Sequence, residues 1–126
     1  MELDRDLLSR QEVRSLVEEA HKAQARLAEM SQAEIDRIVA AIAQAGKRDA
    51  AELGRLAWEE TGFGNAQDKA EKNRFAARQV YEAIRDQKTV GILRKDEARK
   101  VWDVGVPVGV IAGIVLGEYA VKSGWF

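Results

Sequence analysis

The stretch Pro-Val-Gly-Val-Ile-Ala-Gly-Ile-Val, residues 107–115, is the most apolar run in the chain and carries no charge. It is too short to span a membrane, because a spanning helix needs about 20 apolar residues and Glu118 follows closely. A β-branched run opened by a proline is typical of a central strand that is buried on both faces of a parallel sheet. The residues that follow, 116–126, cannot supply the neighbouring strands and crossover helices of such a sheet. We therefore expect the chain to be the beginning of something larger.

Composition limits the possible functions of the 126 residues, which correspond to one domain or a piece of one. The 20 basic residues nearly balance the 21 acidic ones, for a net charge of -1, so no global charge favours nucleic acid or an anionic membrane. There is no Cys, which excludes disulfides, thiolate metal sites and a thiol nucleophile within these residues. The acidic first residues lack the features of a signal peptide, which predicts a cytoplasmic location.

Upstream of the apolar run, residues 9–87 show the patterns of consecutive helices. Residues 9–12 and 31–34 have the capping-box spacing of a Ser followed three positions later by Glu, which predicts two helix starts. We expect these helices to end near Ala28 and Gly46, a third to run from Asp49 to a cap at Gly62, and a fourth to cover residues 65–86. The expected core-facing stripe of the first helix consists of Val13, Leu16, Val17, Ala20, Ala23 and Leu27. The spacing predicts a packed helical layer.

The period then changes from helical to extended. Residues 89–93 and 100–104 are β-prone, and a charged connection, residues 94–99, separates them, so we predict a β-hairpin within residues 88–106. Trp102 and Val104 are expected on one face, with Val101 and Asp103 on the other. An isolated hairpin is marginal in water and normally joins a larger sheet or another subunit.

A set of motifs occurs in the order and spacing of the CoA-acylating aldehyde dehydrogenases, and residues 13–115 resemble the N-terminal region of that family. The motifs are Glu59-Glu60-Thr61-Gly62-Phe63-Gly64, Asp68-Lys69, Lys72-Asn73, Phe75-Ala76, Tyr81, Ile84, Asp86, Lys88-Thr89-Val90-Gly91 and residues 107–115. The resemblance implies an α+β fragment with an N-terminal helical layer, a hairpin of the oligomerisation sheet, and the first strand of a Rossmann-like domain. It divides the chain into helices (9–87), hairpin (88–106), first strand (107–115) and an atypical tail (116–126).

The resemblance also implies a reaction. In the family a cysteine thiolate attacks an aldehyde, hydride passes to NAD or NADP, and the acyl group leaves on coenzyme A. Where the family continues with a Pro and then an Asn that helps bind the oxyanion, this chain has Leu116, Gly117, Glu118 and Tyr119, and the Cys position would lie beyond them. We therefore expect a truncated piece that is inactive alone and holds no catalytic residue. The alternative is a non-catalytic helical module for oligomerisation or interaction.

The cofactor residues that the resemblance assigns to this chain are Ile114 and Val115, whose backbone would pass the nucleotide. Burial in a strand explains both residue types equally well, because each buried side chain contributes about 1.5–3 kcal/mol without any ligand. NAD or NADP and coenzyme A are expected in the intact family, and tight binding to this chain is not. The expected partners are a second copy or intact dehydrogenase subunits, contacted through the hairpin, rather than nucleic acid or a membrane.

Three further groups favour structural interpretations. His21 is the only His and has no ligand-type neighbours for a metal. Glu59 and Glu60 could form an acid/base pair, but adjacent helical residues point about 100° apart, which favours a solvated carboxylate and one near the cap. The basic residues Arg94, Lys95, Arg99 and Lys100 could contact a phosphate, but the acidic residues among them favour a solvated hairpin turn.

Overall fold

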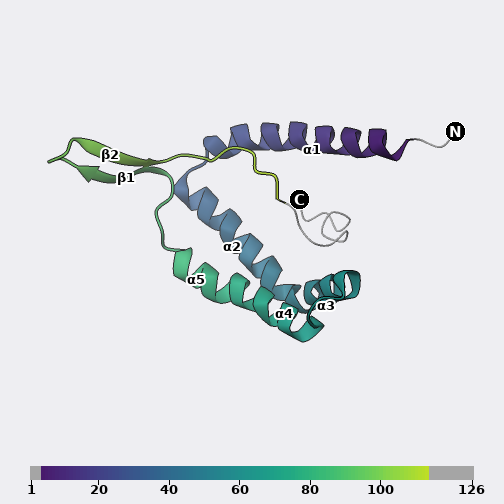
Figure 1. Ribbon diagram of the computed structural model, residues 1–126. Helices are drawn as coiled ribbons and strands as arrows, with labels where there is room; N and C mark the ends of the chain where they lie inside the picture. Colours follow the sequence, from purple (N-terminus) through teal and green to yellow (C-terminus); the bar gives the residue numbers. More distant parts are fainter. Residues whose placement is uncertain (1–3, 114–126) are drawn as a thin grey trace. The chain divides into compact units, whose positions relative to one another are not determined.

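A computed structural model describes residues 4–113, which form helices followed by a two-stranded sheet (Figure 1). The chain divides into two compact units. The first unit combines Met1–Gln32 with Thr89–Ala112, and the second combines Ala33–Lys88 with Gly113–Phe126. Among the described residues, no helix is both long and apolar enough to cross a membrane.

The first unit begins with α1, Arg5–Ala28, which ends where the sequence predicts but starts earlier. The prediction of a start at Ser9 is wrong, because the Asp4 carboxylate accepts a hydrogen bond from the Asp6 N–H at 3.0 Å and caps the helix instead. The predicted burial of its apolar stripe is also wrong. No α1 residue is buried, and Val13 and Leu16 are 59% and 56% exposed, because the first unit presents no helix against this face.

The rest of the first unit is the predicted hairpin, with β1 at Gly91–Asp96 and β2 at Val101–Gly105 paired antiparallel. The register pairs Ile92 with Val104 and Lys95 with Trp102, and it shifts between Ile92 and Arg94, so Leu93 forms a bulge. The prediction that residues 94–99 form the connection is wrong at its start. Strand β1 continues through the charged residues to Asp96, because their side chains find partners across the sheet.

The second unit contains α2 (Gln32–Arg48) except for its first residue, which belongs to the first unit, together with α3 (Ala50–Thr61) and a helical run made of α4 (Ala66–Phe75), η1 (Ala76–Val80) and α5 (Tyr81–Ile84). The caps at the end of α3 and at the start of α4 lie where the sequence predicts helix ends. Gly62 adopts φ +66° and donates its N–H to the Trp58 carbonyl at 2.8 Å, and the Asn65 side chain accepts from the Asp68 N–H at 2.8 Å. The Asp49 side chain makes no cap hydrogen bond, because its carboxylate is paired with Arg48 at 2.8 Å.

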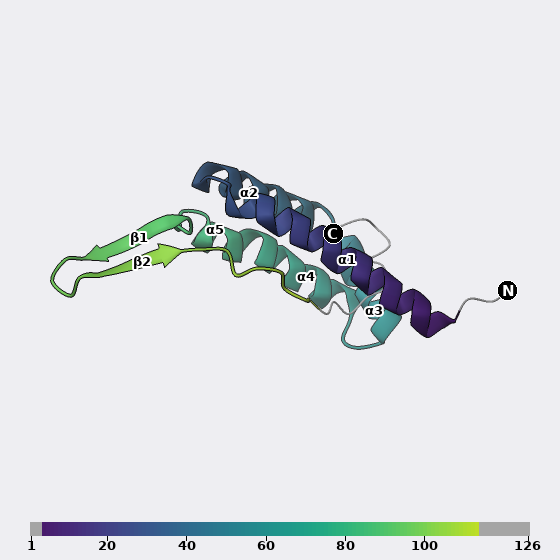
Figure 2. The same cartoon turned by 90° about the horizontal axis from the view of Figure 1, so that it is seen from above.

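The closest packing in the second unit joins α3 to α4, which lie side by side in both views (Figures 1 and 2). Ala50 and Ala70 are 1% and 5% exposed, and Gly54 is buried between the two backbones. A Cβ at Gly54 would lie 2.6 Å from the Ala70 nitrogen. Asn73 extends the contact by donating its side-chain N–H to the Ala50 carbonyl at 3.3 Å. This junction forms the small core of the unit.

The π-helical segment η1 interrupts the predicted long helix at Ala76–Val80 without ending it. Its Ala77 Cβ would lie 3.4 Å from a Cβ added at Gly46 of α2, so the two helices approach closely at small residues. The sequence does not predict this segment, because Ala, Arg, Gln and Val carry no local signal for a wider helical turn.

The predicted strand at residues 107–115 differs from the structure over its described part. Residues 107–113 are assigned no strand, and Gly109 has a φ of +105°, which is outside the β region. A strand exists by hydrogen bonding to a neighbour, and β1 and β2 pair with each other rather than with this segment. An apolar strand pattern alone therefore does not form a strand here.

Candidate functional site

The two predicted cofactor residues, Ile114 and Val115, lie outside the described residues. The segment leading to them is open to solvent, with Val108 and Ile111 exposed by 88% and 73%. Within residues 4–113, no buried side-chain N or O atom lacks a partner, and no cluster of three or more metal-type ligands occurs.

One face of the hairpin carries exposed apolar side chains, and we call it the apolar hairpin face. It consists of Ile92, Trp102 and Val104. Ile92 lies directly opposite Val104 in the register, and Trp102 precedes Val104 by two positions in β2, so all three point to one side. Trp102 is 53% exposed and Val104 is 51% exposed. Exposed aromatic and aliphatic side chains on one face are enriched in surfaces that bind other proteins.

Polar contacts hold the far end of the hairpin. On the apolar face, the Lys95 ammonium lies 4.3 Å from the centre of the Trp102 ring. On the opposite face, Arg94 Nε donates to Asp103 Oδ2 at 2.8 Å across the strands. Near the turn, the Arg99 N–H donates to Asp96 Oδ1 at 2.9 Å. The predicted cationic run is therefore engaged locally, as expected for a hairpin turn.

The base of the hairpin is tied to the start of α2 by one side chain. Gln32 Oε1 accepts from the backbone N–H groups of Thr89 and Val90 at 2.8 and 2.9 Å, and Gln32 Nε2 donates to Thr89 Oγ1 at 3.1 Å. Gly105 packs against the Thr89 carbonyl, where a Cβ would clash. The sequence does not predict this cluster, because no local pattern links residues 57 positions apart.

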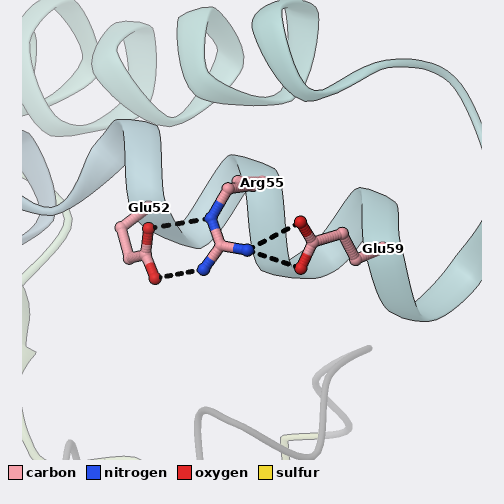
Figure 3. Close-up of polar contacts among 3 residues, drawn as sticks. All are labelled: Glu52, Arg55 and Glu59. Atoms are coloured by element: carbon pink, nitrogen blue, oxygen red, sulfur yellow. Dashed lines mark hydrogen bonds and ion pairs between the residues drawn. The ribbon is translucent and has the colours of Figure 1, made fainter.

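The suggested acid/base pair at Glu59 and Glu60 is not supported, because Glu59 belongs to an ion-pair ladder on α3 (Figure 3). Arg55 bonds Glu52 through Nη2 at 2.6 Å and through Nε at 3.1 Å, and its Nη1 bonds Glu59 at 2.6 Å. The hydrogen bond from Arg55 lowers the pKa of Glu52, and burial opposes that shift. The hydrogen bonds that Arg55 donates to Glu52 and Glu59 in turn raise the pKa of Arg55. These ion pairs stabilise α3 along its exposed face, so they favour a structural role for Glu59 over an acid/base role.

His21 lies exposed on α1, and Glu19 and Lys22, which flank it in the sequence, pair with each other at 2.7 Å. The Lys22 hydrogen bond lowers the pKa of Glu19. This arrangement supports the interpretation of His21 as an ordinary surface residue.

Comparison with known proteins defines the class to which this fold belongs. The aldehyde dehydrogenase family model matches residues 5–116, so the chain belongs to the aldehyde dehydrogenase family. The match includes α1, the helices of the second unit and the hairpin.

Three more particular relatives are dehydrogenases, two of which are named as acetylating. The crystal structure of an acetylating aldehyde dehydrogenase from Geobacillus thermoglucosidasius matches with a TM-score of 0.75 and 53% identity, covering 80% of this chain and 22% of that chain. The bifunctional aldehyde-alcohol dehydrogenase AdhE of Escherichia coli K12 is 38% identical over 104 residues, 82% of this chain and 12% of AdhE. The acetylating succinate-semialdehyde dehydrogenase of Clostridium kluyveri is 33% identical over 100 residues, covering 79% of this chain and 22% of that protein.

These matches confirm the predicted family and the predicted mostly helical fold with a hairpin, which is similar to the N-terminal part of an acetylating aldehyde dehydrogenase. The chain spans about an eighth of AdhE and less than a quarter of the acetylating enzymes. The similarity in structure is therefore limited to the N-terminal region of these enzymes.

Proposed function

We propose that residues 4–113 are the N-terminal scaffold of an acylating aldehyde dehydrogenase that oxidises an aldehyde to its acyl-CoA with NAD or NADP as hydride acceptor. The observation that carries this proposal is the match, at 53% identity and a TM-score of 0.75, to the corresponding part of an acetylating aldehyde dehydrogenase. The names of AdhE and of the Clostridium kluyveri enzyme support the same class of reaction. A cytoplasmic location stays a prediction.

In this proposal the scaffold does not catalyse the reaction alone. The sequence contains no Cys, and the reaction needs a nucleophile that also leaves well, which a thiolate provides. The described residues supply no buried unpaired polar group for a nucleotide. The thiol and the binding groups for NAD or NADP and coenzyme A would come from the remainder of the catalytic unit.

Two exposed apolar surfaces support the proposal that the scaffold packs against the remainder of the catalytic unit. Val108, Val110 and Ile111 are 88%, 45% and 73% exposed, an unfavourable arrangement for a run of apolar side chains. The apolar hairpin face is also open, and a two-stranded sheet has unpaired edges. We propose that residues 107–113 join the sheet of the catalytic unit and that the hairpin contacts a second copy or another dehydrogenase subunit.

A chimaera tests the proposed function. Residues 5–113 replace the matching segment of the Geobacillus thermoglucosidasius enzyme, and acyl-CoA formation is followed with NAD and with NADP. We expect activity within about tenfold of the parent, because the replaced segment shares the parent's fold and the nucleophilic Cys remains that of the parent. The 126-residue chain alone should give no acyl-CoA.

The matched control is the same chimaera with the nucleophilic Cys of the parent replaced by Ala. A folded chimaera with no more activity than this control would refute the assignment as an acylating scaffold. Acyl-CoA formation by the isolated chain would refute its dependence on the rest of the enzyme.

The alternative function, a self-sufficient interaction module, rests on the apolar hairpin face. Such a module has to cover its own apolar run, whereas residues 108 and 111 are largely exposed. The first proposal accounts for this exposure and for the family match together.

A further inference from the structure

The base of the hairpin contains two consecutive backbone donors that precede the first strand. Thr89 and Val90 lie between α5 and β1, outside every helix and strand, so neither amide has a ladder partner in the sheet. Both N–H groups donate to a single acceptor, Gln32 Oε1, at 2.8 and 2.9 Å. The same carboxamide donates from Nε2 to Thr89 Oγ1 at 3.1 Å. Three hydrogen bonds thus converge on one neutral side chain.

The hydrogen bonds of Gln32 join two segments that are distant in the sequence. Gln32 is the first residue of α2, directly after the turn from α1, whereas Thr89 leads into β1. Gln32, Thr89 and Val90 all belong to the first unit, so within that unit the contact joins the base of the hairpin to the residue that follows the turn after α1. Gly105 at the end of β2 packs against the Thr89 carbonyl from the other strand, and a Cβ there would clash. The entry and exit of the hairpin are thereby held at the same point.

We propose that Gln32 is a positioning residue that holds the hairpin in the orientation required for association through its apolar face. The inference rests on the proposed association through the hairpin and names the residue on which it depends. Without the carboxamide, Thr89 and Val90 lose their acceptor, and the hairpin can pivot about residues 88–90. Ordering it again on association then costs conformational entropy, which weakens binding.

Three variants of the full 126-residue chain separate the roles of the side chain. Gln32→Leu removes the hydrogen-bond acceptor and donor of the carboxamide while keeping a side chain of similar size. Gln32→Glu keeps an acceptor for the two N–H groups, and an acidic residue is favourable in the first turn of a helix. Gln44→Leu is the matched control, because Gln44 is an exposed glutamine of the same helix.

The measurements are amide hydrogen exchange at Thr89 and Val90 and the dissociation constant for self-association by sedimentation velocity. For Gln32→Leu we expect about tenfold faster exchange at both amides and about tenfold weaker association, as for the loss of a pair of hydrogen bonds. Gln32→Glu should retain both properties, and Gln44→Leu should match the wild type.

Failure of the inference is distinguishable from failure of the proposed association. If the wild type associates and Gln32→Leu leaves either exchange or association unchanged, Gln32 is not the positioning residue. A wild type that stays monomeric at every concentration contradicts association through the hairpin. In that case, unchanged exchange at Thr89 and Val90 in Gln32→Leu would overturn the positioning role as well.

Discussion

Gly54 is the residue on which the junction of α3 and α4 depends. A side chain at this position would meet backbone atoms of Ala66 and Ala70 at 2.6–2.9 Å, and backbone cannot move aside as a flexible side chain can. We expect Gly54→Ala to lower the free energy of unfolding by about 1–3 kcal/mol despite the higher helix propensity of Ala. Urea unfolding followed by helical circular dichroism measures this change.

Gly46→Ala is the control for that substitution, because it also replaces a glycine within a helix. Its new Cβ would lie 3.4 Å from Ala77, an ordinary contact, so stability should be unchanged or increase by up to about 1 kcal/mol. Equal stability of the two variants would contradict the close approach of α3 and α4.

At the scale of elements, one face of the hairpin is apolar and the other carries the Arg94–Asp103 ion pair. Trp102 and Val101 are adjacent on β2 and equally exposed, at 53% and 50%, but they point to opposite sides. If the apolar hairpin face is the interface, Trp102→Ala should weaken self-association about tenfold or more, because aromatic residues dominate interface energies.

The matched variant Val101→Ala should leave the dissociation constant within about twofold of the wild type, since energetically important residues cluster on the contacted face. Analytical ultracentrifugation distinguishes the two variants. A larger effect of Val101→Ala would place the interface on the face that carries Arg94 and Asp103.

The elements also show which features a sequence can predict. Gly62, Asn65 and the alternation of Trp102 with Val101 are local signals, and the structure confirms each of them. The start of α1 was predicted wrongly, because Asp4 provides a cap that competes with Ser9. The Gln32 contact, the crossing at Gly54 and the exposure of the α1 stripe depend on residues distant in the chain, so no periodicity reveals them.

For the molecule as a whole, the apolar run at residues 107–115 is the feature that most directly bears on the proposed function. Its composition predicts a buried strand, whereas its described part, residues 107–113, has no strand partner and exposes most of its large side chains. This difference follows if the strand forms against the remainder of the catalytic unit, where neighbouring strands satisfy its backbone and cover its side chains. The family match extends to residue 116 and includes the whole run.

Hydrogen exchange at the amides of residues 108–113 tests this account most directly, measured in the 126-residue chain and in the chimaera with the Geobacillus thermoglucosidasius enzyme. The account predicts exchange close to that of an unstructured peptide in the chain alone and strong protection in the chimaera, where the strand gains its neighbours. Strong protection in the isolated chain would contradict it, because the run would then have found its partner without the rest of the enzyme.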